Sequence, residues 1–153
     1  MTLNEWLAVY GESHQNPTNI AIHKICVPAI VFTVLGMFWS IPMPQAIAAI
    51  PYANAATLVV VLALLFYLRL SLAMAAGMAI MSGAFLLILE QMQLAQLPIL
   101  RISIGLFVLA WIGQFYGHKV EGKKPSFFKD LQFLLIGPAW TLSWLYRRLG
   151  IRY

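Results

Sequence analysis

The chain is poor in charge. Asp, Glu, Lys and Arg make up 10% of its 153 residues, and five of these are acidic. A soluble domain carries about a quarter charged residues, so the polar side chains needed to cover a water-soluble globule are missing. Hydrophobic residues make up 61% of the sequence, and its mean hydropathy is +0.81. The composition excludes an ordinary soluble domain and predicts a protein whose solvent is the lipid bilayer.

Cysteine and targeting signals are scarce as well. A single cysteine, Cys26, excludes an internal disulfide. The polar and aromatic stretch 1–19 does not combine a basic start, an apolar core and a small-residue cleavage site, so we expect no signal peptide. Internal repeats and low-complexity tracts are not evident either. We therefore expect a single transmembrane helical domain over residues 1–153.

Apolar segments separated by proline, glycine and charged residues predict an all-α integral membrane bundle of about four transmembrane helices. The first expected span is the apolar part, 25–41, of a helix that starts at residue 17 and runs to about residue 40. The other spans are expected over about 52–68, 72–89 and 99–116. An N-terminal interfacial helix is expected over 2–12. The last segment, 127–149, is interrupted by Gly137-Pro138 and predicts a bent C-terminal helix, with a full fifth span as the alternative.

Local signals mark where the first span begins and bends. Asn16-Pro17 is typical of a helix start, because asparagine caps free amides and proline at the first helical position sacrifices no hydrogen bond. Pro28 lies inside the same segment and predicts a kink near Lys24. Arg69 and Ser71 interrupt the apolar run and predict a tight turn between spans two and three.

The basic residues predict how the bundle is oriented. The net charge is +5. If there are four spans, then Lys24, Arg69 and the run 119–129 share one side, and Arg101 is the exception. Excess Lys and Arg mark cytoplasmic loops, so we expect both termini in the cytoplasm. The membrane would be the bacterial inner membrane, or the endoplasmic reticulum in a eukaryote. This explanation needs no nucleic-acid partner for the basic clusters.

The chain contains three histidines, His14, His23 and His118. Two precede span one and the third ends span four, so an even number of crossings separates them. All three are therefore expected at the cytoplasmic face. Neutral imidazole is the commonest protein ligand for iron, zinc, copper and nickel, and the histidines together predict a metal site.

Polar neighbours accompany these histidines at helical spacing. Asn19 lies four residues before His23, and Gln114 four before His118, so each pair shares a helix face. Both amides are candidates for contact with a substrate or for support of the ligands. Glu121 is a candidate fourth ligand, or an acceptor that orients His118. The alternative role of the three histidines is as polar anchors at the membrane interface.

Two motifs carry a family resemblance. The pattern His14…Asn19…His23…Pro28, followed by Gln114-Phe115-Tyr116-Gly117-His118…Glu121-Gly122-Lys123-Lys124-Pro125, resembles the 2-hydroxy fatty acid dioxygenase family of fungi, plants and bacteria. The resemblance extends to Trp6, Tyr10 and Gly137-Pro138. It implies a multi-pass membrane enzyme that depends on Fe(II) and uses molecular oxygen to remove one carbon from a 2-hydroxy long-chain fatty acid.

The resemblance also implies residue roles. It assigns the iron to His14, His23 and His118, and the catalytic group would be these histidines with Glu121. Asn19, Gln114, Lys123 and Lys124 would contact the substrate or support the ligands. This sequence departs from the family at Cys26, where a small residue, often glycine, is expected. It departs again at Lys123-Lys124, where arginine is common and would hold a carboxylate in a bidentate fork.

Other functions fit the residues less completely. A transporter or proton relay should carry ionisable residues at mid-membrane depth, and spans two to four contain almost none. A non-catalytic scaffold leaves the histidines unexplained. A zinc-dependent membrane hydrolase needs a similar ligand set, and the residue pattern does not choose between metals. The pattern gives no oligomeric state.

Overall fold

The computed structural model describes residues 1–123 and 133–153, and this part of the chain is helical without strands. The helices are α1 (Leu3–Gly11), α2 (Pro17–Trp39), α3 (Gln45–Ala48), α4 (Ala55–Leu70), α5 (Leu72–Leu94), α6 (Ile99–Glu121) and α8 (Ile136–Leu149). The predicted all-α membrane fold is confirmed.

Three of these helices, α2, α5 and α6, are long and apolar enough to cross a membrane. Each has 23 residues, or about 35 Å at 1.5 Å per residue, against a hydrocarbon core of about 30 Å. The remaining expected span, the second along the chain, corresponds to α4, which is apolar but has 16 residues. The helix α8, with 14 residues, is shorter than the fifth span considered as an alternative.

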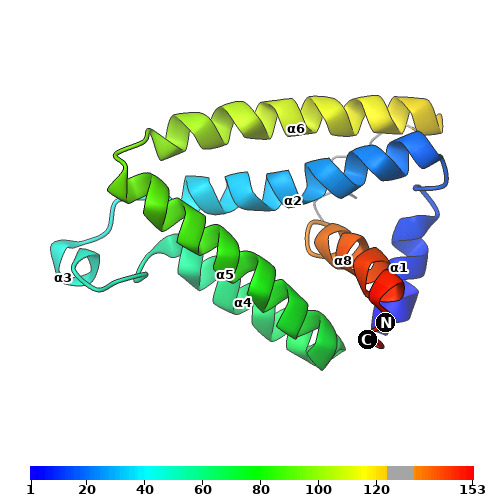
Figure 1. The fold of residues 1–153 in the computed structure, drawn as a ribbon, viewed down its shortest axis with the longest axis horizontal. Coiled ribbons are helices and arrows are strands. Elements are labelled where there is room, and N and C mark those ends of the chain that lie inside the picture. The colour runs from blue at the N-terminus through cyan, green and yellow to red at the C-terminus, as the bar shows by residue number, and fades with distance from the viewer. Residues whose placement is uncertain (124–132) are drawn as a thin grey trace.

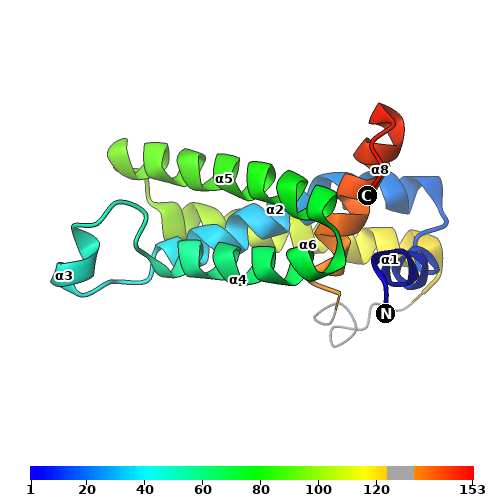
Figure 2. The same cartoon turned by 90° about the horizontal axis from the view of Figure 1, so that it is seen from below.

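Helix α2 lies at the centre of the molecule (Figure 1). It packs along α6, which runs in the opposite direction, and it also contacts α4, α5 and α8. Helices α4 and α5 form a hairpin that crosses the far half of α2, whereas α1 and α8 pack together beside its first half (Figures 1 and 2). The first half of α2 is therefore enclosed by α6, α8 and the start of the chain.

The helix boundaries follow the capping residues. The Asn16 side chain accepts a hydrogen bond from the Thr18 amide at 2.9 Å, with Pro17 in the first turn, which confirms the predicted start of α2. Asn54 and Ser71 cap α4 and α5 in the same way. Because Asn54 sets its start, α4 begins later than the expected residue 52.

Prolines and glycines lie within, at the start of, or at the end of several helices. Helix α2 continues through Pro28, and its two halves lie slightly out of line in Figure 1. The sequence predicts a bend at Gly137-Pro138, but these residues lie in the first turn of α8. Proline is tolerated there, because an N–H in the first turn has no hydrogen-bond partner within the helix. The expected helix start at residue 127 lies outside the described residues. Gly122 has φ +76° and ends α6.

Small residues allow α2 and α6 to approach closely. A Cβ added to Gly117 would lie 2.4 Å from Asn19 Oδ1, and one added to Gly113 would lie 2.7 Å from Cys26 Sγ. Farther along, the same interface brings Gly36 against Ser103. Close backbone approach at small residues is how helices pack in lipid. The glycine at 113 makes room for the cysteine at position 26.

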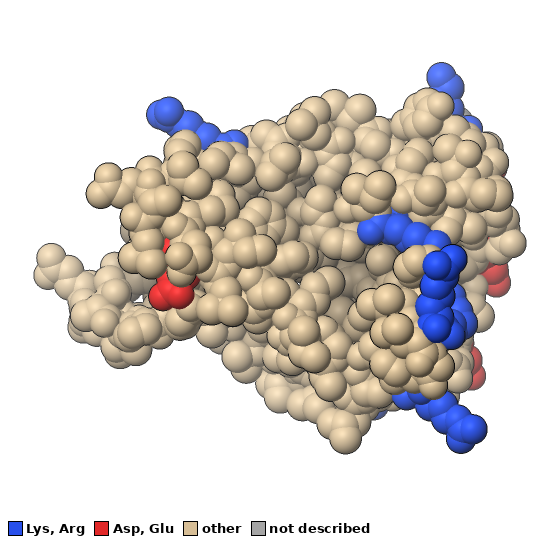
Figure 3. All heavy atoms as spheres, in the orientation of Figure 1, with Lys and Arg blue, Asp and Glu red and all other residues tan. Residues whose placement is uncertain are grey.

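The ends of the bundle differ in charge. Most of the visible Lys and Arg side chains lie at the end that carries α1 and α8, whereas one group of acidic atoms lies toward the opposite end (Figure 3). The tight turn between α4 and α5, with Arg69, is also on the side of the two termini (Figure 1). Basic side chains are therefore concentrated toward the end of the molecule that carries the two termini.

The α2–α6 contact yields a testable prediction. We expect Gly113→Ala to destabilise the protein by about 1–3 kcal/mol, because the added methyl overlaps Cys26 Sγ in a packed interface. Gly105→Ala on the same helix meets no atom within 4 Å and should be neutral or slightly stabilising. Thermal unfolding in detergent measures both variants. If Cys26→Gly fails to restore stability to Gly113→Ala, the assigned contact is wrong.

Candidate metal centre

The three histidines meet at the end of the bundle where α2 begins and α6 finishes. His23 comes from the second turn of α2, His118 from the last turn of α6, and His14 from the turn between α1 and α2. One ring nitrogen from each lies within 4.8 Å of the others. The ring centroids of His14 and His23 are 4.3 Å apart, and those of His23 and His118 are 5.1 Å apart. The three histidines thus lie together at one end of the bundle, and their place at the cytoplasmic face stays a prediction.

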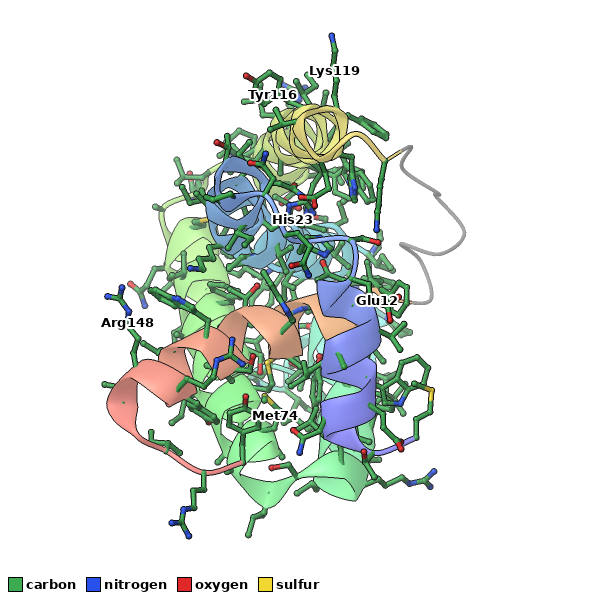
Figure 4. All side chains as sticks on the ribbon, turned by 90° about the vertical axis from the view of Figure 1, so that its right-hand side faces the viewer. Glu12, His23, Met74, Tyr116, Lys119 and Arg148 are labelled. Carbon is green, nitrogen blue, oxygen red and sulfur yellow. The ribbon has the colours of Figure 1, made fainter. Side chains whose placement is uncertain are left out.

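All three imidazoles are buried: His14 and His118 are 6% exposed and His23 is 1% exposed. Figure 4 shows His23 between α2 and α6, whereas Lys119 on α6 points away from the bundle. Burial disfavours the charged form of an imidazole and lowers the pKa of His14. A neutral imidazole keeps a lone pair, which is what a metal ion requires.

Backbone carbonyls orient two of the rings. His14 Nδ1 lies 2.7 Å from the Tyr10 carbonyl oxygen, and His23 Nδ1 lies 3.0 Å from that of Asn19, each one helical turn earlier. A carbonyl oxygen only accepts, so each Nδ1 carries the proton and each Nε2 keeps its lone pair. This arrangement, in which one ring nitrogen is held and the other is free, is typical of metal-binding histidines.

Two ring nitrogens in the cluster have no hydrogen-bond partner among the described residues. They are His14 Nε2 and His118 Nδ1, and both are buried. A buried polar atom without a partner costs about 1–3 kcal/mol, so an arrangement with two of them requires an explanation. A cation among the three nitrogens would satisfy both, and the donor set therefore fits a metal ion.

Aromatic side chains hold His14 in place. The Tyr10 ring stacks on it, with 4.3 Å between centroids and 8° between planes, and Trp140 of α8 lies 5.2 Å away at a tilt. The sequence analysis missed these two as site residues. Tyr10 lies four residues before His14, a spacing that could have pointed to the contact, but Trp140 reaches the site only through the packing of α8.

Glu121 ties the end of α6 to the α1–α2 turn. Its carboxylate accepts hydrogen bonds from the amides of Gln15 and Asn16, both at 2.9 Å, and from Asn19 Nδ2 at 3.0 Å. Within the described residues, these bonds go to the turn and to Asn19 rather than to His118. The contacts place Glu121 beside the cluster, in a position that fixes the segment carrying His14.

The other predicted residues divide between the site and the surface. Gln114 is buried and its Oε1 has no partner among the described residues. Asn19 is fully buried against Gly117. Lys123 is exposed and donates through Nζ to the Glu12 carbonyl at 2.7 Å. Lys124 lies outside the described residues.

A cavity of about 130 Å³ opens beside the cluster, well above the roughly 10–15 Å³ that one water molecule needs. His23, Gln114 and His118 line one part of it, and nearly all of the remaining lining is apolar. The lining follows α2 from His23 to Leu35 and includes side chains of α4 and α5. These α2 positions span about 18 Å of helix at 1.5 Å per residue. The histidines therefore stand by a long apolar space inside the bundle.

Comparisons with known proteins give two significant matches. A family described as "Mpo1-like: 2-hydroxy-palmitic acid dioxygenase Mpo1-like" matches residues 1–149. The 2-hydroxy-palmitic acid dioxygenase MPO1 of Saccharomyces cerevisiae is 30% identical over 154 residues, covering 98% of this chain and 83% of the yeast protein. No solved structure matches significantly. The family match over nearly the whole length shows that this chain belongs to the 2-hydroxy-palmitic acid dioxygenase Mpo1-like family.

Proposed function

We propose that this protein is an Fe(II)-dependent dioxygenase that shortens 2-hydroxy long-chain fatty acids by one carbon. The observation that carries the proposal is the buried trio of histidines beside a long apolar cavity. The name of the yeast relative supplies the reaction class and the kind of substrate. A hydrolase acting on a water-soluble substrate would have no use for such a cavity.

His14, His23 and His118 would hold the iron. Three neutral imidazoles leave coordination positions open, which a 2-hydroxy carboxylate and oxygen require. When bound, Fe(II) supplies the one-electron chemistry that lets molecular oxygen react with the 2-hydroxy acid. The protein supplies the rest: burial lowers the pKa of His14 and keeps its imidazole neutral, and backbone carbonyls fix the rings of His14 and His23.

Gln114 is the group best placed to meet the polar head of the substrate. Its side chain is buried and lines the cavity beside His23 and His118, with Oε1 unpaired within the described residues. An acceptor in this position suits a 2-hydroxyl group. Lys123 and Asn19 support the site by holding the α1–α2 segment through Glu12 and Glu121. For Lys124 a role at the substrate carboxylate stays a prediction.

The acyl chain would occupy the apolar cavity. Its α2 wall of about 18 Å is comparable with one leaflet of the hydrocarbon core, about 15 Å, which is the depth that a membrane-dissolved chain already fills. Residues of α4 and α5 would surround the chain and exclude water from it.

The site would face the cytoplasm, together with both termini. The basic side chains at the end that carries α1 and α8 support this orientation, since Lys and Arg accumulate on the cytoplasmic side. The substrate head would then lie at the cytoplasmic surface of the inner membrane, or of the endoplasmic reticulum in a eukaryote.

The first prediction concerns the iron ligands. We expect His23→Ala to lose bound iron and to lower oxygen uptake with 2-hydroxypalmitate by more than about a hundredfold, while the protein stays in the membrane. Elemental analysis without added metal and an oxygen electrode measure the two effects. Thr33→Val, another buried polar position on α2, is the control and should keep both. Full activity in His23→Ala would contradict the iron site, and bound zinc without oxygen uptake would favour the hydrolase.

The second prediction concerns chain length. Ala63 of α4 lines the cavity away from the histidines, so Ala63→Phe should shorten it and shift the preference toward shorter 2-hydroxy acids, about tenfold in relative kcat/KM. Ala79→Phe adds the same ring on the exposed side of α5 and should leave the preference unchanged. Competition between 2-hydroxy acids of different length measures the ratio. An equal profile for both variants would remove the acyl chain from this cavity.

The third prediction concerns Glu121 as a positioning residue. Glu121→Ala removes three hydrogen bonds to the turn and Asn19 and should weaken iron binding about 10–100-fold. Saturating iron should restore turnover with an unchanged KM, because Glu121 does not line the cavity. Glu121→Gln should lie between wild type and alanine, and the exposed Glu12→Ala should resemble wild type. Loss of turnover that iron does not restore would make Glu121 part of the chemistry.

A further inference from the structure

A second cluster of charged side chains lies away from the histidines, where α8 crosses α2. Trp144 of α8 stands between two cations: Lys24 Nζ is 3.7 Å from its ring centroid, and Arg148 Cζ is 4.7 Å from it. Arg147 precedes Arg148 on the same helix. Figure 4 shows Arg148 on the outer side of α8, well separated from His23. We call Lys24, Trp144, Arg147 and Arg148 the Trp144 cluster.

The Trp144 cluster has no countercharge in the part of the chain that the structure describes. The charged groups that act on Lys24 are Arg148 and Arg147, and both are cationic. Arg147 donates through Nη1 to Ser143 Oγ at 3.2 Å and to the Tyr153 hydroxyl at 3.0 Å, which are neutral partners. The end of α8 offers its negative helix dipole to the arginines, but Lys24 is on another helix. Two cations held on one indole, with Arg147 beside them on α8, favour an anion at this place.

The surroundings of the cluster select the kind of anion. Exposed apolar side chains border it: Ile25 follows Lys24 and is 74% exposed, and Leu149 follows Arg148 and is 63% exposed. Trp144 itself is half-buried, and an indole of this kind favours the boundary between headgroups and acyl chains. An anion that meets both the cations and the apolar border must carry a charged head and a hydrocarbon part.

We propose that the Trp144 cluster binds the phosphate headgroup of an anionic phospholipid, whose acyl chains lie on Ile25, Leu145 and Leu149. The lipid would pin α8 to α2 through Lys24 and Arg148. The contact matters for the rest of the molecule, because Gly137 and Pro138, at the start of α8, line the cavity, and Trp140 packs on His14. This inference concerns a site separate from the proposed iron centre, and it stands or falls independently.

The test uses the purified full chain in nanodiscs of phosphatidylcholine with increasing phosphatidylglycerol, with thermal unfolding as the readout. A ligand of the folded state raises Tm as its concentration increases. We expect phosphatidylglycerol to raise the Tm of the wild type. In Lys24→Gln/Arg148→Gln, the content needed for half of the rise should increase roughly thirtyfold, which corresponds to two lost surface charges.

A matched control removes two other cations. Arg101→Gln/Lys119→Gln loses the same charge at exposed positions of α6 and should keep the wild-type response. If both double variants lose the response equally, or neither does, the cluster is not the site. Inorganic phosphate added to pure phosphatidylcholine discs should not raise Tm. An equal rise with phosphate would show a small-anion site and overturn the lipid assignment.

A measurement on the wild type needs no variant. Phosphatidylglycerol with a photoreactive headgroup should label peptides that contain Lys24 or residues 144–148. Labelling confined to other peptides would overturn the proposal, even if the double variant failed to fold.

Discussion

The close antiparallel packing of α2 against α6 is the contact on which the rest of the structure depends. Gly113 and Gly117 of α6 have no side chain beyond a hydrogen atom. Cys26 and Asn19 of α2 occupy the space that a Cβ at these two positions would need. The hydrophobic effect does not favour helix association within lipid. Van der Waals contact at small residues therefore stabilises the α2–α6 pair. The same register brings His23 and His118, which are far apart in the chain, within reach of one ion. The α1–α2 turn then adds His14, and Glu121 on α6 fastens that turn.

Burial has two opposite consequences at the site. It makes unpaired nitrogens costly, and within the described residues His14 and His118 each leave one ring nitrogen that a bound cation would satisfy. It also keeps His14 neutral, so that its lone pair is available without loss of a proton. The apolar cavity extends this environment into the bundle and suits a substrate that is already dissolved in the bilayer. One pocket of this kind would hold both parts of the proposed substrate: its charged head at the membrane surface and its acyl chain between the helices.

Much of this arrangement could be predicted from the sequence, because it depends on local signals. Asn16-Pro17 marks the start of α2. The expectation of an even number of crossings leads to the grouping of His14, His23 and His118, which the structure brings together. The parts that could not be predicted depend on tertiary packing. The partners of Glu121 lie more than a hundred residues away, and no pattern announces them. Trp140 lies more than a hundred residues from His14 in the chain, and only the docking of α8 brings the two rings together. Gly137-Pro138 signals a break equally well whether a helix bends or begins there.

The central claim is that three imidazoles from three separate segments close on one iron ion. X-ray absorption at the iron edge, on protein loaded with one equivalent of Fe(II), tests it most directly. The account predicts stoichiometric binding and the multiple-scattering signature of about three imidazoles, reduced by one in each single His→Ala variant that still retains iron. A spectrum of oxygen ligands without imidazole scattering, or one unchanged when His14, His23 or His118 is replaced, would contradict it.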